Sequence, residues 1–155
     1  MNARQRMALA PLTPSRAHDQ AFKRDAGHDA LQQEVLAFLR GRSLAQSGAT
    51  IISRTVEAEM PFRKRGQIVA YADIGEIIDT PLCRIVNIYE IKPRIETVFG
   101  IVRQAKVLAD LVQDIEADQR YVNVVVPHTD PLGPALLREW PRTWAWRRDF
   151  DWGAR

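Results

Sequence analysis

Two of the carboxylates and the one lysine in the stretch that spans residues 71–92 are candidates for chemistry. Asp73 lies inside one apolar run, and the tripeptide Glu90-Ile91-Lys92 ends the next one. Removing a carboxylate from water is costly unless a neighbouring group compensates its charge. Two acids and a lysine that one hairpin brings together therefore predict a metal ion as the compensating group.

The register of that hairpin decides whether these side chains share a face. Side chains alternate along a strand, so Glu90 and Lys92 project from one face while Ile91 points away. Paired residues of an antiparallel hairpin share a face, so pairing of odd with even numbers puts Asp73 opposite Ile88 or Glu90. A shift of one residue would move Asp73 to the other face, and the sequence permits the productive register without requiring it.

In the productive register, the carboxylates of Asp73 and Glu90 and the backbone carbonyl of Ile91 can converge on one hard cation. Mg²⁺ prefers such oxygen ligands, with one or two carboxylates completed by water and phosphate, and Mn²⁺ can substitute for it. Lys92 would lie beside this ion. There it would orient an attacking water or offset the charge of a transition state at phosphorus.

The hydrophobic pattern predicts the elements that position these side chains. Apolar residues recur with helical spacing over residues 29–40 and 95–118. The predicted strands cover residues 50–62, 67–78, 83–92 and 121–127. A short helix and a final strand or packing segment follow at residues 133–140 and 143–150. This order predicts an α/β (α+β) fold, with a central mixed sheet flanked by helices.

One domain accounts for most of the chain. Residues 1–28 lack a clear period, which predicts an N-terminal extension that is only partly helical. Residues 29–155 predict a single domain whose C-terminal segment is rich in tryptophan and arginine. A chain of 155 residues can bury a core without disulfides, and its one cysteine, Cys83, excludes an internal disulfide framework.

Two polar side chains lie on the flanks of the predicted helices. Glu34 follows Leu31 by three residues and precedes Phe38 by four, so it lies beside the buried face of the first helix. Gln104 lies beside the apolar stripe of the second helix. Because both helices would cover the sheet, both side chains are candidates to support the hairpin site.

These residues resemble the PD-(D/E)XK nuclease superfamily over about residues 29–127. Asp73 resembles the metal-binding acid of that superfamily's second strand, and Glu90 and Lys92 resemble its acid and lysine on the third. Ala72 stands where the superfamily often has a proline, and no subfamily can be assigned. The resemblance implies a restriction-endonuclease-like αβββαβ core.

The resemblance also implies an activity, a cofactor and a partner. It implies a metal-dependent deoxyribonuclease that uses Mg²⁺ to hydrolyse phosphodiester bonds of DNA. Glu34 resembles the additional acid on the first helix, which would assist in holding the metal. Gln104 resembles the glutamine that RecB-like members place beside the catalytic lysine. Small domains of this superfamily often act in pairs, which implies a homodimer.

Basic residues bear on the choice of partner. The net charge is +3, a mild bias that is compatible with nucleic acid. The candidate contacts to nucleic acid are Arg63, Lys64, Arg65, Arg94, Arg147 and Arg148. Solvated loops and strand edges explain each basic cluster equally well. The tryptophans near the C-terminus could stack on bases or, more commonly, seal a sheet edge or an interface.

The apolar runs are too short to indicate a membrane partner. None approaches the roughly 18 residues that a membrane span requires. The N-terminal residues also lack the apolar region of a secretory signal. Together with the single cysteine, these features predict a reducing cytoplasm as the compartment.

Two other interpretations remain open. A nuclease-fold domain could be catalytically weak or inactive and serve in DNA binding or protein assembly. In an unrelated α+β domain the acids would be structural, with Asp73 capping a turn or bulge and Glu90 pairing with Lys92. His18 and His28 have no convincing partner at metal-ligand spacing, so neither is predicted to be functional.

Overall fold

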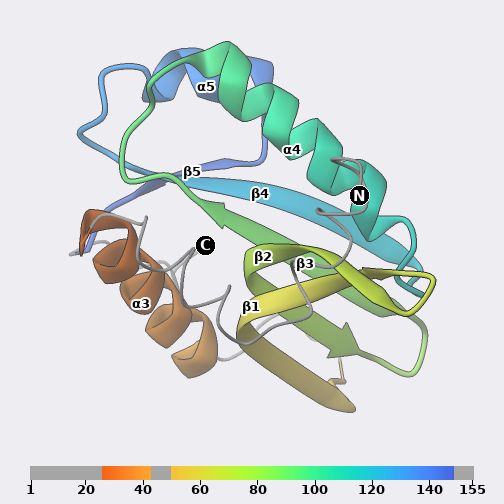
Figure 1. Cartoon of the computed structure of the whole chain (residues 1–155). Helices are drawn as coiled ribbons and strands as arrows, with labels where there is room; N and C mark the ends of the chain where they lie inside the picture. The colour runs from red at the N-terminus through yellow and green to blue at the C-terminus, as the bar shows by residue number, and fades with distance from the viewer. Residues whose placement is uncertain (1–25, 43–49, 149–155) are drawn as a thin grey trace.

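A five-stranded mixed sheet lies between two helical layers in the computed structural model, which describes residues 26–42 and 50–148 (Figure 1). The elements in chain order are α3 (Ala26–Gly41), β1 (Ser53–Lys64), β2 (Gln67–Asp79), β3 (Arg84–Ile91), α4 (Val98–Val112), β4 (Gln119–Pro127), α5 (Gly133–Glu139) and β5 (Thr143–Trp146). The predicted fold class, with a mixed sheet flanked by helices, is therefore confirmed.

The sheet changes direction after its third strand. Its order is β1-β2-β3-β4-β5, and the first three strands form an antiparallel meander. Strand β4 runs parallel to β3, and β5 runs parallel to β4. Helix α4 connects β3 to β4, as a parallel neighbour requires a crossover connection. The final strand expected in the Trp-rich segment is β5.

Alternating residues of the central strands build two cores. On β3, Val86 and Ile88 pack in a cluster with α4, whereas Tyr89 and Ile91 pack in a cluster with α3. Figure 1 shows the two helices on opposite sides of the sheet. Burial on both faces explains why β3 and β4 read as nearly continuous apolar runs in the sequence.

Two helix boundaries differ from the prediction. Helix α3 begins at Ala26 instead of residue 29, so His28 belongs to the helix and not to an N-terminal extension. Helix α4 begins after Thr97, whose hydroxyl accepts a hydrogen bond from the Gly100 backbone N–H at 3.1 Å. It ends at Val112, before residue 118, and the following residues run to β4.

Several earlier expectations concern residues outside the described ranges. They are the partly helical character of residues 1–25, the role of His18, and the end of the Trp-rich segment at residues 149–155. Within the described residues, no helix is long and apolar enough to cross a membrane.

A close contact between β1 and β2 makes Gly75 difficult to replace. A Cβ added at Gly75 would meet the Sδ of Met60 and lie 2.7 Å from its Cβ. Gly75→Ala is therefore expected to lower the free energy of unfolding by about 1–3 kcal/mol, because the buried Met60 side chain must shift. Urea denaturation would measure the change.

Gly41→Ala is the matched control for this substitution. Gly41 ends α3, and a Cβ there meets no atom within 4 Å. Alanine is the better helix former, so this variant is expected to be neutral or slightly more stable. Equal losses of stability in the two variants would contradict the packing explanation.

Candidate active site

The β2–β3 hairpin has the register that the candidate site requires. Its last two paired residues are Ile74 and Tyr89, so odd numbers pair with even ones and Asp73 and Glu90 come next. Beyond this point the Ile91 backbone N–H donates to the Oδ2 of the Asp73 side chain at 2.8 Å, and not to a backbone carbonyl of β2. Asp73 therefore lies where the two strands separate.

An irregularity on the other side of β2 coincides with Asp73. The β1–β2 ladder pairs Ala58 with Ile74 and Met60 with Ala72. Ala58 and Ile74 pack on the α3 side of the sheet, whereas Met60 and Ala72 pack on the α4 side.

Residues two apart normally share a face, so both strands change face at this point. Glu59, the β1 residue between these pairs, has a φ of 54°, which is uncommon for a residue other than glycine. Backbone irregularities of this kind often occur where a functional side chain must be aimed.

Glu90 is buried and binds two of the predicted site residues. The Lys92 Nζ donates to its Oε1 at 3.0 Å, and the Gln104 Nε2 donates to the same oxygen at 2.7 Å. Neither of these hydrogen bonds involves Oε2. The fold therefore brings together Glu90 and Lys92 from the end of β3 and Gln104 from α4.

Burial and a second acid both raise the pKa of Glu90. Loss of water, and then the negative charge of Asp73, raise the pKa of Glu90 to about 7. The positive charges of Lys92 and His28 oppose this rise and do not cancel it. Two neighbouring carboxylates that are incompletely compensated would gain from an additional cation, which is the property expected of a metal site.

The raised pKa predicts how stability depends on pH in the absence of metal. Folded Glu90 holds its proton more tightly than an ordinary carboxyl, whose pKa is 4.5. Between about pH 4.5 and about pH 7, the folded state therefore binds more protons at this residue than the unfolded state. Through Glu90, the free energy of unfolding is expected to fall as the pH rises across this range.

Urea denaturation in a chelator at about pH 5 and about pH 7.5 would test this sign. Glu90→Gln should gain stability relative to wild type at the higher pH, because glutamine cannot ionise. Glu116→Gln, which changes an exposed residue after α4, is the control and should follow wild type. The assignment fails if wild type and Glu90→Gln respond to pH identically.

Two α3 side chains that were not among the predicted site residues contact Asp73. His28 Nε2 lies 3.3 Å from the Asp73 Oδ2, and the Gln32 side-chain amide donates to the Asp73 backbone carbonyl at 2.7 Å. His28 therefore has a partner that its spacing in the sequence did not indicate, while its functional role stays untested. Residues four apart share a helix face, so α3 holds both the side chain and the backbone of Asp73.

A signal for Gln32 existed in the sequence. Gln32 lies between Leu31 and Val35 on the buried side of α3, and a buried amide needs hydrogen-bond partners. No such signal existed for His28, because the residues before it lack an apolar period that would extend the helix.

Glu34 lies in a different environment from the one expected. Its carboxylate accepts a hydrogen bond from the Trp146 indole at 3.2 Å and pairs with the Arg148 guanidinium at 3.0 Å. Glu34 lies six residues after His28, which is about 9 Å along a helix axis and on a different side of it. The contacts that the structure gives Glu34 are therefore to the C-terminal segment, and its part in holding the metal stays a prediction.

The donor set limits which metals the site would suit. Among the described residues, no three His, Cys, Asp or Glu side chains form a group that could hold a metal ion. Two carboxylates alone suit Mg²⁺, which commonly keeps several waters. The part of the Ile91 carbonyl in such a site stays a prediction.

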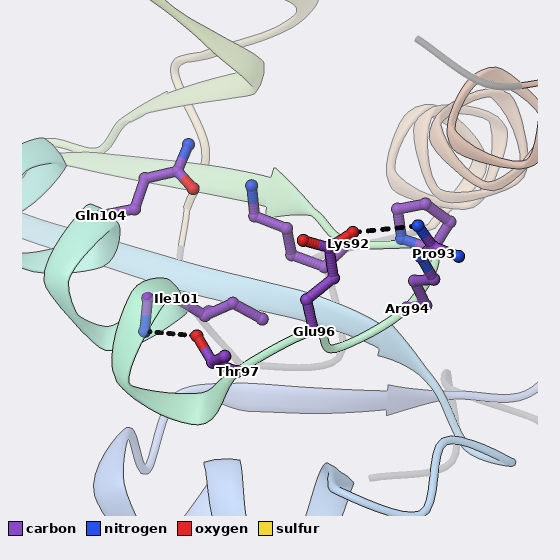
Figure 2. A pocket seen from close by; sticks show the side chains of 8 residues that line it. Lys92, Pro93, Arg94, Glu96, Thr97, Ile101 and Gln104 are labelled. Carbon is purple, nitrogen blue, oxygen red and sulfur yellow. Dashed lines mark hydrogen bonds and ion pairs between the residues drawn. The ribbon is translucent and has the colours of Figure 1, made fainter.

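A pocket of about 520 Å³ opens beside Lys92 and Gln104 (Figure 2). Its wall continues through the loop after β3 to the first turn of α4, where Arg94 pairs with Glu96 at 2.9 Å. Figure 2 shows the side chains of Lys92 and Gln104 extending toward the same side of this pocket. The two residues that donate to Glu90 therefore line a pocket on the side of α4, whereas Asp73 and Glu90 are buried and do not line it.

The predicted basic residues are spread over separate places. Arg63 and Lys64 are exposed at the end of β1 and Arg65 in the turn that follows, while Arg94 lines the pocket. Arg148 pairs with Glu34, as described above.

The tryptophans mostly seal the fold. Trp140 donates to the Val122 carbonyl at 2.9 Å, Trp144 packs edge-on against Tyr89, and Trp146 is buried. Sealing the sheet is therefore their role in the described residues.

Comparison with known proteins finds no matching family model, no matching curated protein and no matching solved structure. Arguments about function therefore depend on the site itself.

Proposed function

We propose that this protein is a Mg²⁺-dependent nuclease that hydrolyses phosphodiester bonds of DNA, with a restriction-endonuclease-like core. The observation that carries the proposal is the environment of Glu90. This acid is buried, its pKa is raised by burial and by Asp73, and its Oε1 binds both Lys92 and Gln104. Displaced pKa values in a cluster of complementary groups are typical of catalytic sites.

The order of elements supports the same proposal. A helix precedes an antiparallel meander, and a second helix crosses to a parallel fourth strand. This is the arrangement that the resemblance implied. Asp73 and Glu90 lie at the end where β2 and β3 separate, and α3 holds Asp73 there through Gln32.

The residues present fit a magnesium ion. Asp73 and Glu90 repel each other at a buried position, and they would hold the ion together with water and a phosphate oxygen. When bound, the cation would neutralise the two carboxylates and polarise the phosphodiester.

The other side chains would position the reactants. Lys92 would orient the attacking water or offset the charge that develops on the phosphate oxygens. Gln104 would hold the Glu90 carboxylate at the wall of the pocket, and Arg94 would meet a neighbouring phosphate of the DNA strand. In the reaction, the water oxygen forms a bond to phosphorus and the bond to the leaving oxygen breaks. The products are a phosphate monoester and a free hydroxyl group.

A cleavage assay with Lys92→Ala tests the proposal. Supercoiled plasmid and branched DNA would be incubated with the protein and Mg²⁺ or Mn²⁺. Wild type is expected to cleave, and Lys92→Ala to be slower by on the order of 10²-fold or more. Lys106→Ala is the control, because Lys106 is exposed on α4 and does not line the pocket.

Equal cleavage by wild type and Lys92→Ala would overturn the catalytic role of Lys92. Tight DNA binding by wild type without cleavage in either metal would instead favour a nuclease-fold binding or assembly module. In that case His28 and Lys92, which contact the two acids, would serve as the permanent compensating cations.

A further inference from the structure

A second pocket, of about 660 Å³, lies at the end of α3 that is remote from Asp73. Phe38 contributes to it from α3 and Arg42 from the residue after α3. Asn123 contributes from β4, Arg142 from the loop before β5, and Trp144 from β5. Arg42 follows His28 by 14 residues, which corresponds to roughly 20 Å along a helix. This pocket is therefore distinct from the candidate active site.

Arg142 is oriented in advance by two contacts. Its Nε donates to the Asn123 Oδ1 at 3.1 Å, and its guanidinium lies 4.0 Å from the centroid of the Tyr121 ring. Asn123 is itself buried, and its amide donates to the Ile88 carbonyl at 3.1 Å. No acidic side chain of the described residues pairs with Arg142. A held guanidinium whose terminal N–H groups face no carboxylate is suited to bind an anion.

Arg42 adds to the positive charge of the second pocket. Arg42 and Arg54 both contact the carboxylate of Glu76, so two guanidinium groups share one negative charge. Of these three residues only Arg42 lines the pocket; with Arg142 it gives the pocket two guanidinium groups, and no carboxylate is among the lining residues. The pocket therefore favours a ligand that carries negative charge.

The remaining wall is apolar and partly aromatic. Trp144 is half-buried, and its indole packs edge-on against Tyr89 at a centroid distance of 5.2 Å. Phe38 contacts the pocket from α3, and the exposed Leu137 contacts it from α5. A fixed aromatic side chain beside paired cations matches a ligand with a charged group and a flat apolar group.

We propose that this pocket binds a nucleotide, with its phosphate on Arg142 and Arg42 and its base against Trp144 and Phe38. The nucleotide could be free or could belong to a single-stranded nucleic acid, since both present the same chemistry. The proposal depends on the second pocket alone and does not require the protein to cleave DNA.

Binding measurements in a chelator would test the proposal without cleavage. Calorimetric titration with deoxyadenosine monophosphate and with inorganic phosphate would compare a nucleotide with a bare anion. Anisotropy with a short labelled single-stranded oligonucleotide would reveal whether the nucleotide is recognised within a strand. We expect binding of the monophosphate, the oligonucleotide or both, at least about tenfold tighter than that of phosphate.

Arg142→Gln is expected to weaken this binding by about tenfold or more, because it removes a charge-assisted bidentate contact. Arg103→Gln is the matched control, since Arg103 is exposed on α4 across the sheet. Arg142→Lys should retain only part of the affinity, because lysine keeps the charge and loses the planar fork. Thermal denaturation of each variant would verify folding.

Three results would overturn the proposal. They are unchanged binding in Arg142→Gln, an equal loss in Arg103→Gln, and phosphate binding as tight as nucleotide binding. Binding of the monophosphate is measured in a chelator, without cleavage, so failure of the pocket and failure of the nuclease proposal can be told apart.

Discussion

Asp73→Asn is expected to lower DNA cleavage by on the order of 10²- to 10³-fold, with little loss of stability. Asparagine keeps an oxygen that can accept the Ile91 backbone N–H, and Gln32 bonds to the backbone of residue 73, which the substitution leaves in place. What disappears is one of the two negative charges at the site. Because Glu90 alone is a weaker attraction for a divalent cation, metal binding should weaken and cleavage should fall with it.

Thermal denaturation with and without Mg²⁺ would separate this effect from misfolding. The melting temperature of wild type should rise when Mg²⁺ is added, because a ligand that binds only the folded state stabilises it. Asp73→Asn should show a smaller rise or none.

Asp79→Asn provides the same substitution at the other end of β2, where Asp79 pairs with Arg84 at 2.6 Å. It should cleave as wild type does. Full cleavage by Asp73→Asn, or an undiminished response to Mg²⁺, would remove Asp73 from the proposed metal site.

Glu76→Ala is expected to lower the free energy of unfolding by about 3–5 kcal/mol. Glu76 is fully buried on the α3 side of the sheet. Arg54 Nε donates to its carboxylate at 2.8 Å, Arg42 at 3.0 Å, and Asn87 and the Tyr89 hydroxyl at 3.0 and 3.1 Å. Removing the acid leaves two part-buried guanidinium groups without their shared counter-ion.

Urea denaturation would measure this loss. Glu57→Ala is the control, since Glu57 is an exposed acid on β1 and should be nearly neutral. Replacing Glu76, Arg42 and Arg54 together by apolar residues of similar size should recover much of the stability, because no unpaired charge then remains buried. If Glu76→Ala were as stable as Glu57→Ala, the network would contribute little to the fold.

Periodicity was sufficient to predict the elements and the class of fold. The helices and strands lie where the spacing of apolar residues predicts them. The buried face of a helix needs apolar residues at the helical period, and that of a strand needs them at every second position. It was not sufficient at the start of α3. Ala26, Gly27 and His28 include no large apolar side chain, so the pattern ends before the helix does.

The sequence was also sufficient to predict the hairpin of the candidate site. Asp73, Glu90 and Lys92 lie on two strands joined by one short turn, so their proximity depends only on register. The predicted pairing of odd with even numbers is the one observed. The resemblance implied that Gln104 lies beside Lys92, and in the structure both side chains donate to the Glu90 Oε1.

Other features depended on how distant segments pack. Glu34 binds Trp146, which follows it by 112 residues, and nothing local to α3 specifies that partner. Glu76 reads as one polar residue within a strand, yet its counter-ions come from the end of α3 and from β1.

The sequence by itself determined where the helices and strands lie, except for the start of α3 and the end of α4. It also determined that two acids and a lysine belong to one hairpin. Those properties follow from local alternation along the backbone. Only the tertiary structure decided that His28 and Gln32 contact Asp73 and that Glu34 contacts Trp146 and Arg148. It also decided that Arg142 and Arg42 line a second pocket. Such contacts depend on the position of a helix on a sheet, which the packing of many side chains sets jointly.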